Sequence, residues 1–381
     1  MSVLYICTLN QDRTYMLKKF AVKNYKGFAD KIEWDLSKHS NYAFSDFAIR
    51  DGIVKNAIIY GPNGVGKSNF SQAIFDIVYH LSRKHTTARH YSNYVHVGRP
   101  TNPVEFEYTF KFGSVTIDYK YSKDGKGKLL SEQMFVDGTE WFQRSQRQLW
   151  VDSDLFPIDP SAKGQWANSV NNASVVNFLL TSYPMAKDHP LILLQQFVES
   201  MLWFRCLDTR EFTGLEDGVS NIEEYIIENN LLDSFSEFLE DVSGQHFEFV
   251  KAEPTHKHIL CRIGGNTTLF WEIASTGTIS LSLLYYWLNH KDKASLIVID
   301  EFDAFYHFRL ASTVCKSLFS LTCQVFLTSH DTYLMSNELL RPDCNFILNG
   351  KTIKPLNECT TKELRFGHNI EKMFRGNAFS V

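Results

Sequence analysis

The chain has 381 residues and a formal net charge of −4, with 44% hydrophobic and 22% charged residues. These proportions are typical of a globular protein with a sizeable core, and they exclude a mainly disordered chain or one that coats nucleic acid through an overall basic charge. No window approaches the ~18–20 consecutive apolar residues of a membrane span, and the start lacks a secretory signal pattern. The seven cysteines are scattered and form no C-x-x-C pair. We therefore expect a cytoplasmic protein without a membrane partner.

The first part of the chain is expected to form β-structure around one strand–turn–helix unit. Residues 1–15 form an N-terminal extension to which the sequence assigns no role. Alternating apolar residues within 16–24 and 32–36 predict a strand pair. Residues 56–60 then predict a short buried strand, and the spacing of apolar residues over 69–81 predicts the helix that follows it.

A change of period follows this helix. Apolar and polar residues alternate strictly over 104–112 and again over 115–121, with a Gly113-Ser114 turn between the two runs. This pattern predicts an antiparallel hairpin, which further Asp-Gly turns extend into a meander ending near residue 142. We therefore assign residues 16–150 to the first half of the main lobe, with an antiparallel β subdomain.

The pattern becomes helical from about residue 157 to 242, and we assign 151–250 to an inserted helical subdomain. Two strand-like runs, 296–299 and 325–327, then end in polar residues of catalytic type, within a second half of the lobe at 251–381. The predicted fold is α/β, and its two halves are separated by the β and helical insertions.

The turn after the strand at 56–60 matches the phosphate-binding pattern G-x-x-x-x-G-K-[ST] at every fixed position. Its residues are Gly61, Pro62, Asn63, Gly64, Val65, Gly66, Lys67 and Ser68, and Asn69 follows in the helix. Glycines let backbone N–H groups surround a phosphate at the start of the helix. Lys67 is expected to place its charge between the β- and γ-phosphates of ATP, and the Ser68 hydroxyl to ligate Mg²⁺.

Each of the two later strands ends at candidate catalytic residues. Asp300 and Glu301 follow four apolar residues, and we expect Asp300 to hold Mg²⁺ and Glu301 to orient and deprotonate the attacking water. His330 ends the other strand, where it can contact the γ-phosphate. Ser275 and Gly277 precede an apolar helical run and predict an anion site at a helix start.

These motifs predict a P-loop NTPase and together resemble ABC-type ATPases of the SMC and RecF kind. In those ATPases two adjacent acids follow a buried strand, as Asp300 and Glu301 follow residues 296–299 here. More narrowly, the chain is similar to small AAA-type ATP-binding proteins of bacterial abortive-infection and phage-defence systems, of the AbiLi/RloA sort, and more distantly to the AriA and Septu ATPases. The closing run Leu364–Gly376 carries the pattern typical of that narrower group. The chain departs from its neighbours because it has no long heptad arms and no appended nuclease.

The resemblance implies an ATPase that binds ATP and Mg²⁺ in the cytoplasm and forms a homodimer or higher oligomer, with the Ser275/Gly277 motif reaching the γ-phosphate held by the other subunit. It also implies a separately encoded effector, such as a Toprim-like nuclease, that the ATPase holds or releases. The alternative is a RecF-like DNA-binding ATPase of DNA repair, with DNA as the partner of local lysines. A transporter motor is a third and weaker alternative, because the string L-S-G-G-Q is absent.

Overall fold

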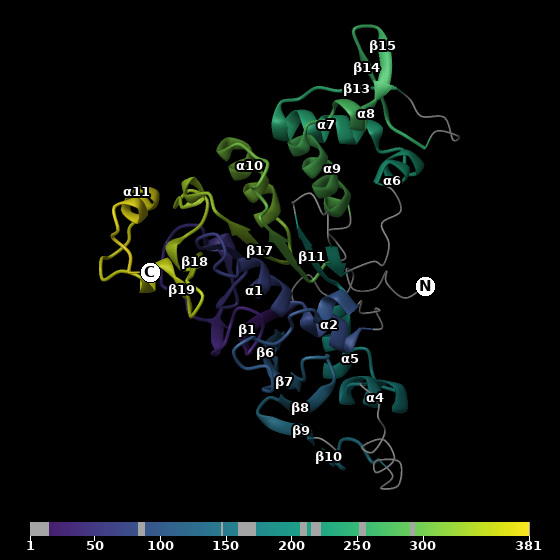
Figure 1. Ribbon diagram of the computed structural model, residues 1–381, viewed down its shortest axis with the longest axis vertical. Helices are drawn as coiled ribbons and strands as arrows, with labels where there is room; N and C mark the ends of the chain where they lie inside the picture. The colour runs from purple at the N-terminus through teal and green to yellow at the C-terminus, as the bar shows by residue number, and fades with distance from the viewer. Residues whose placement is uncertain are drawn as a thin grey trace.

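The computed structural model describes residues 15–82, 88–145, 148–158, 173–205, 212–214, 222–250, 257–289 and 294–380. The expected N-terminal extension therefore lies outside the described residues except for Tyr15, which begins the first strand. The described chain is organised around two seven-stranded sheets, with helices on both sides of the second one (Figure 1).

The first sheet is antiparallel and has the strand order β10-β9-β8-β7-β6-β1-β2. Its strands are β1 (Tyr15–Lys23), β2 (Ile32–Asp35), β6 (Val104–Phe112), β7 (Val115–Lys123), β8 (Leu129–Val136), β9 (Thr139–Ser145) and β10 (Gln148–Val151). Every second side chain of β6 is buried, from Val104 to Phe112, because alternate side chains of a strand point to opposite faces. The predicted hairpin and meander are thus confirmed.

The second sheet has the order β12-β11-β16-β17-β5-β18-β19, and its five inner strands are parallel. The inner strands are β5 (Asn56–Tyr60), β11 (Met201–Arg205), β16 (Leu296–Asp300), β17 (Gln324–Ser329) and β18 (Asn345–Leu348), and the antiparallel edges are β12 (Phe212–Gly214) and β19 (Ile353–Pro355). All five residues of both β5 and β16 are buried, as expected for strands covered on both faces.

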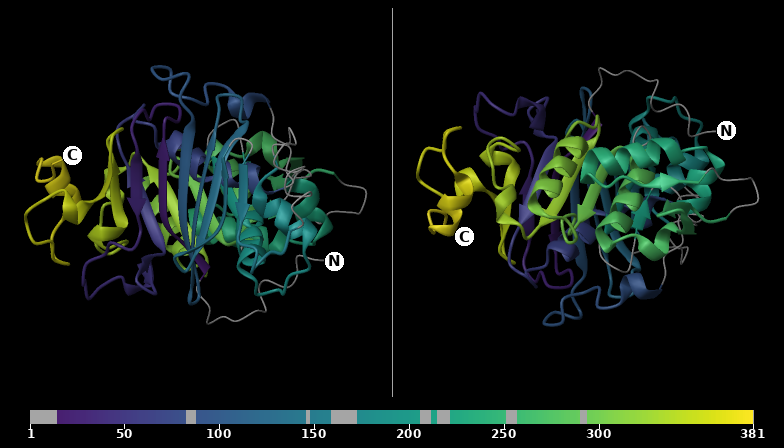
Figure 2. Two further views of the ribbon diagram at one scale, coloured as in Figure 1. Left: turned by 90° about the horizontal axis from the view of Figure 1, so that it is seen from below. Right: turned by 90° about the horizontal axis from the view of Figure 1, so that it is seen from above.

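Aromatic side chains join the two sheets. The Trp34 ring of β2 lies 4.7 Å from Phe326 and 5.2 Å from Phe346, between ring centroids, and 5.7 Å from Phe70 of α1 (Lys67–Ile74). Helix α2 (Asp76–Leu81) continues from α1. Helix α10 (Phe308–Phe319) covers the opposite face of the parallel sheet, so the two faces of that sheet are covered differently (Figure 2).

The expectation of one helical block over 151–250 is wrong in its middle. Strand β11 lies inside this range, in register beside β16, and separates α4 (Val175–Ser182) and α5 (Pro190–Glu199) from α6 (Ile222–Glu228) and α7 (Leu232–Ser243). Four of the five β11 residues are buried, and such a strand shows no alternation. A short apolar run of this kind cannot be distinguished from a piece of buried helix by periodicity.

The two separated helix groups occupy different places. Helix α5 packs beside α2, near the antiparallel sheet, whereas α6 and α7 lie at the other end with α8 (Phe270–Ile273), α9 (Thr276–Leu288) and the small sheet β13-β14-β15 (Figure 1). That sheet comprises Glu248–Phe249, Leu260–Ile263 and Asn266–Leu269. The shorter elements are β3 (Ile49–Arg50), β4 (Ile53–Val54), the 3-10 turn η4 (Thr332–Leu334) and α11 (Ile370–Arg375).

The predicted fold class is confirmed in its main features: an α/β core with a glycine loop after a central strand, an antiparallel sheet and inserted helices. Among the described helices, none is both long and apolar enough to cross a membrane.

Candidate nucleotide-binding site

The predicted site residues meet at one edge of the parallel sheet. Strand β17 lies between β5 and β16, and Ser329 is paired with Tyr60 at the ends of their strands. Because the three strands run in the same direction, the loop after Tyr60, the acids at the end of β16 and His330 after β17 emerge at the same edge. Sequence motifs more than 200 residues apart are thereby brought together.

The glycine loop is shaped by close contacts that leave no space for side chains at two of its glycines. Gly66 has φ = 102°, and a Cβ atom there would lie 2.8 Å from Phe28 Cζ. A Cβ atom at Gly61 would lie 2.5 Å from the backbone oxygen of Leu348. Helix α1 begins directly afterwards at Lys67, so its free N–H groups face the loop. The Val65 amide donates to the Pro62 carbonyl at 3.4 Å, which closes the turn at the loop's tip.

The Lys67 amine occupies the centre of this loop and is 5% exposed. It donates to the carbonyl oxygens of Gly61 at 2.7 Å and Pro62 at 3.2 Å, and it lies 3.2 Å from His330 Nδ1. Burial lowers the pKa of Lys67, while the negative charges of Asp300 and Glu301 oppose this shift. In this state the lysine is held by its own loop.

Asp300 is a fully buried carboxylate with one satisfied oxygen. Its Oδ1 accepts a hydrogen bond from the Thr328 hydroxyl at 2.7 Å, whereas its Oδ2 has no hydrogen-bond partner among the described residues. Burial raises the pKa of Asp300, and hydrogen bonding with Ser68 and Thr328 opposes that rise. A buried carboxylate oxygen without a donor, beside a serine hydroxyl, fits the hard oxygen ligands that Mg²⁺ prefers.

Glu301 is held in an unusual backbone conformation. Its φ angle is 50°, a left-handed value that non-glycine residues rarely adopt and that often occurs at functional sites. Its amide donates to the Thr328 hydroxyl at 2.8 Å, and its side chain is 21% exposed. Because the same hydroxyl donates to Asp300, Thr328 aligns both acids.

The other predicted residues at this sheet edge are His330 and Asn69, and Asp303 follows the two acids in the chain. His330 is exposed, and partial desolvation together with the neighbouring Lys67 charge lowers its pKa, so the neutral ring accepts from Lys67 at neutral pH. Asp303 Oδ2 accepts from the Ser329 hydroxyl at 2.6 Å. Asn69 lies in the first turn of α1.

Ser275 and Gly277 lie at the start of α9. Ser275 is exposed and caps α9, since its Oγ accepts from the Thr278 amide at 3.1 Å. A Cβ at Gly277 would lie 3.0 Å from the Phe305 oxygen, so the start of α9 rests on the segment that follows Asp303. No hydrogen bond among the described residues joins Ser275 or Gly277 to the loop.

Two residues of the site were not predicted from the sequence. Thr328 lies near the end of β17 and has no sequence signal of its own, and its role between the acids appears when β16 and β17 pair. Arg205 ends β11, and its guanidinium approaches both Asp300 and Glu301 at 3.4 Å. A charged residue directly after four apolar ones is the signal that could have identified Arg205 as the end of a central strand.

The closing run packs beside the turn that follows His330. Asn369 caps α11 by accepting from the Lys372 amide at 2.8 Å, and α11 contacts η4. The Asn337 side-chain amide donates to the backbone oxygens of Arg365, Phe366 and His368. These bonds hold the segment that precedes α11 against the core of the protein.

Comparison with solved structures finds low-identity similarity along most of the chain. The SMC head domain from Thermotoga maritima is 16% identical, with a TM-score of 0.41, covering 89% of this chain and 98% of that one. An Smc head domain derived from Pyrococcus furiosus, bound to the C-terminal domain of ScpA, is 13% identical, with a TM-score of 0.43 and coverages of 91% and 98%. The recombination mediator RecF with ATP is 13% identical, with a TM-score of 0.39 and coverages of 90% and 100%. No curated protein matches the chain.

A family model matches residues 57–336, well over half of the chain, and its description is "AAA domain, putative AbiEii toxin, Type IV TA system". The match begins in β5, directly before the glycine loop, and ends after η4, so it contains the whole site described above. The resemblance to abortive-infection ATPases is thereby confirmed, and the chain belongs to this family of AAA-type ATPase domains.

Proposed function

We propose that the protein hydrolyses ATP with Mg²⁺ at the edge where β5, β16 and β17 end. The observation that carries this proposal is the convergence of Lys67, Glu301 and a buried Asp300, whose Oδ2 accepts no hydrogen bond from the described residues, around one glycine loop. A bound Mg²⁺ would neutralise phosphate charge there, and Ser68 and Asp300 are the residues that would hold it.

Each residue then has a distinct role. The Lys67 amine leaves the Gly61 and Pro62 carbonyls and donates to the β- and γ-phosphates, which are stronger acceptors because they are charged. Glu301 accepts the proton of the attacking water, and Thr328 keeps its backbone in place. His330 contacts the γ-phosphate once Lys67 has moved away from it. Gly61–Gly66 and Asn69 enclose the phosphates.

We further propose that two subunits share each ATP. Ser275 and Gly277 present an exposed helix start that no described hydrogen bond links to the chain's own loop. A helix start carries free N–H groups and a positive dipole end, which suit a phosphate. In a symmetric dimer this start would face the γ-phosphate bound by the partner subunit.

We expect Ser275→Arg and Glu301→Gln to be inactive alone and to recover activity when mixed. A mixed dimer has both lesions in one site and neither in the other, and random pairing at equal amounts makes about half of all dimers mixed. Steady-state ATP hydrolysis by the mixture measures the recovery. Sedimentation measures whether the subunits associate. If ATP-loaded Glu301→Gln protein stays monomeric at protein concentrations far above its dissociation constant for ATP, the two subunits do not share ATP. Ser275 would then only cap α9.

We also propose that the ATPase is the switch subunit of an anti-phage, abortive-infection system in the cytoplasm, acting on a separately encoded effector such as a Toprim-like nuclease. Membership in a family described by an AbiEii toxin supports this role. The expected result is that the tagged protein copurifies with the product of a neighbouring gene, and that the complex differs between ATP-loaded Glu301→Gln protein and nucleotide-free protein. Identical recovery in both states would contradict a switch.

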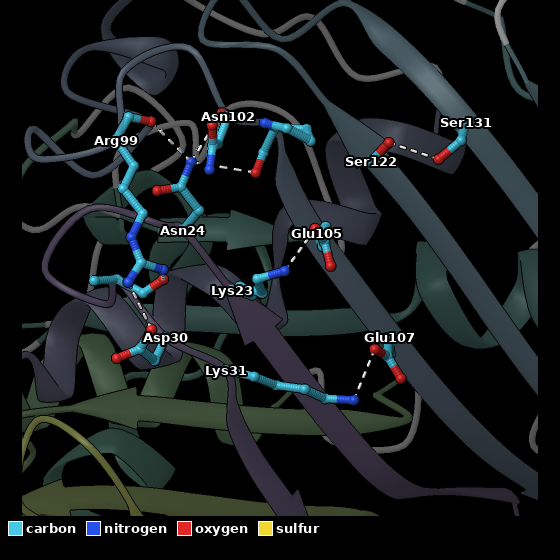
Figure 3. A network of polar contacts seen from close by, with 12 residues as sticks. Lys23, Asn24, Asp30, Lys31, Arg99, Asn102, Glu105, Glu107, Ser122 and Ser131 are labelled. Atoms are coloured by element: carbon cyan, nitrogen blue, oxygen red, sulfur yellow. Dashed lines mark hydrogen bonds and ion pairs between the residues drawn. The ribbon is translucent and has the colours of Figure 1, made fainter.

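The DNA-binding alternative has less support from the lysines that suggested it. Lys23 of β1 pairs with Glu105 at 3.0 Å, and Lys31, directly before β2, pairs with Glu107 at 2.7 Å (Figure 3). Lys19 and Lys120 also pair with glutamates, and Lys123 is buried against Asp76. Lysines already neutralised in this way release few counterions on binding DNA. A steep salt dependence of DNA binding would favour this alternative.

A further inference from the structure

Arg205 forms ion pairs with both acids of the site. It ends β11 and is paired in register with Asp300 of β16. Its Nε lies 3.4 Å from Asp300 Oδ2, and its Nη2 donates to Glu301 Oε1 at 3.4 Å. Its side chain is 27% exposed, so it lies between the buried acid and the surface.

The contact with Asp300 is an ion pair without a hydrogen bond. Neither Arg205 Nε nor Asp300 Oδ2 has a hydrogen-bond partner among the described residues, although both atoms are buried. An arginine paired with a carboxylate usually makes two short parallel bonds. Here the guanidinium donates a hydrogen bond to Glu301 and only approaches Asp300. Asp300 Oδ2 can therefore still accept a hydrogen bond or bind a cation.

The balance of charge at the site depends on this arginine. Three carboxyl groups, Asp300, Glu301 and Asp303, lie near Lys67, whose amine donates to loop carbonyls and not to the acids. A buried carboxylate that loses its partner cation is strongly destabilised, because its charge is then uncompensated. Arg205 therefore supplies the positive charge that Asp300 and Glu301 face in this state.

We propose that Arg205 is a positioning residue that acts as the counter-ion of Asp300 and Glu301 and is displaced when a divalent cation binds. The inference rests on the proposed ATPase function and extends it. While Arg205 holds Glu301 toward β11, the carboxylate is kept from the position of an attacking water. Binding of nucleotide and metal releases Glu301 from Arg205. Glu301 can then align with the attacking water only when both ligands are bound.

The first test is binding of a fluorescent, non-hydrolysable ATP analogue while Mg²⁺ is titrated. Arg205→Ala should reach half-saturation at about tenfold lower Mg²⁺, because a competing cation is gone, and should bind the analogue more weakly without Mg²⁺, because the site is more negative. A merely structural role would weaken binding under both conditions. Arg205→Lys should restore parental behaviour in part, and Arg262→Ala, which breaks an exposed ion pair with Glu248 in the small sheet, serves as the matched control.

The second test needs neither nucleotide nor metal. Arg205→Ala should lower the urea midpoint of unfolding in the parent, and this loss should largely disappear in an Asp300→Asn background, since the neutral amide needs no counter-ion. Arg205→Gln replaces Arg205→Ala if the latter does not fold. The inference would be overturned if the Arg205 variants needed as much Mg²⁺ as the parent or more. It would also be overturned if Arg205→Ala lowered the urea midpoint equally in the parent and in the Asp300→Asn protein. Absence of nucleotide binding by the parent would instead refute the proposed ATPase, and the unfolding cycle would still decide the role of Arg205.

Discussion

Lys67→Ala should weaken ATP binding by on the order of 100-fold or more, since charge-assisted hydrogen bonds contribute about 1.5–3 kcal/mol each and the lysine is expected to make two of them. The amine already lies inside the loop, 2.7 Å from the Gly61 oxygen and 5% exposed. It therefore needs only a short movement to reach a phosphate in the same loop. Equilibrium binding of a fluorescent ATP analogue measures the effect.

Lys67→Ala also removes hydrogen bonds within the empty loop, so folding must be measured alongside binding. The freed carbonyls of Gly61 and Pro62 lie at the sheet edge, and we expect the thermal midpoint to change much less than the affinity. Lys354→Ala, an exposed lysine on the edge strand β19 of the same sheet, is the matched control and should bind ATP as the parent does. Parental affinity in Lys67→Ala would show that the loop is not the nucleotide site.

The sequence alone predicts those strands and helices whose apolar spacing and turn residues lie within a single short stretch of chain. Strict alternation over Val104–Phe112 predicts a strand with one buried face, and apolar spacing over 69–81 predicts a helix after the glycine loop, where the structure has α1 from Lys67 and then α2. Both signals are contained in a single stretch of chain. They could be interpreted without knowing what packs against them, because period and turn chemistry act over a few residues.

Strand β11 could not be recognised in this way. Strand β11 consists of four apolar residues followed by Arg205, and only its place beside β16 distinguishes it from the helices on either side. The same pairing brings Arg205 to Asp300, so missing the strand meant missing the arginine as well. The order of strands in a parallel sheet is set by long-range packing, which no local pattern encodes.

The site was therefore predicted as a set of motifs without the residues that hold them in place. Lys67, Asp300, Glu301 and His330 each end or follow a recognisable strand. Thr328 lies beside the acids because β17 pairs with β16, and its hydroxyl contacts both the Asp300 carboxylate and the Glu301 amide. Residues that position others carry no signature of their own, since a threonine in a strand is ordinary.

Glu301→Gln should bind ATP with parental affinity but hydrolyse it about 10²–10⁴-fold more slowly, the usual loss when a general base is removed. The amide has the size of the carboxylate and cannot accept a proton from water. The left-handed backbone at position 301 strains glutamate and glutamine alike, so the substitution adds no new backbone cost. The Thr328 hydroxyl still accepts from the amide at position 301, and the oxygen facing Arg205 is retained.

Turnover and binding must be measured on the same preparation, because a loss of both would indicate damage to the loop and not to the chemical step. Glu248→Gln removes the charge of an exposed glutamate in the small sheet and should leave turnover unchanged. If Glu301→Gln hydrolyses ATP at a near-parental rate, the base must be another group, and His330, whose lowered pKa keeps it neutral and able to accept a proton, would be the next residue to test. If Glu301→Gln instead accumulates as an ATP-bound dimer or higher oligomer, ATP hydrolysis is the step that separates the subunits. Glu301 then determines how long the ATP-bound oligomer persists.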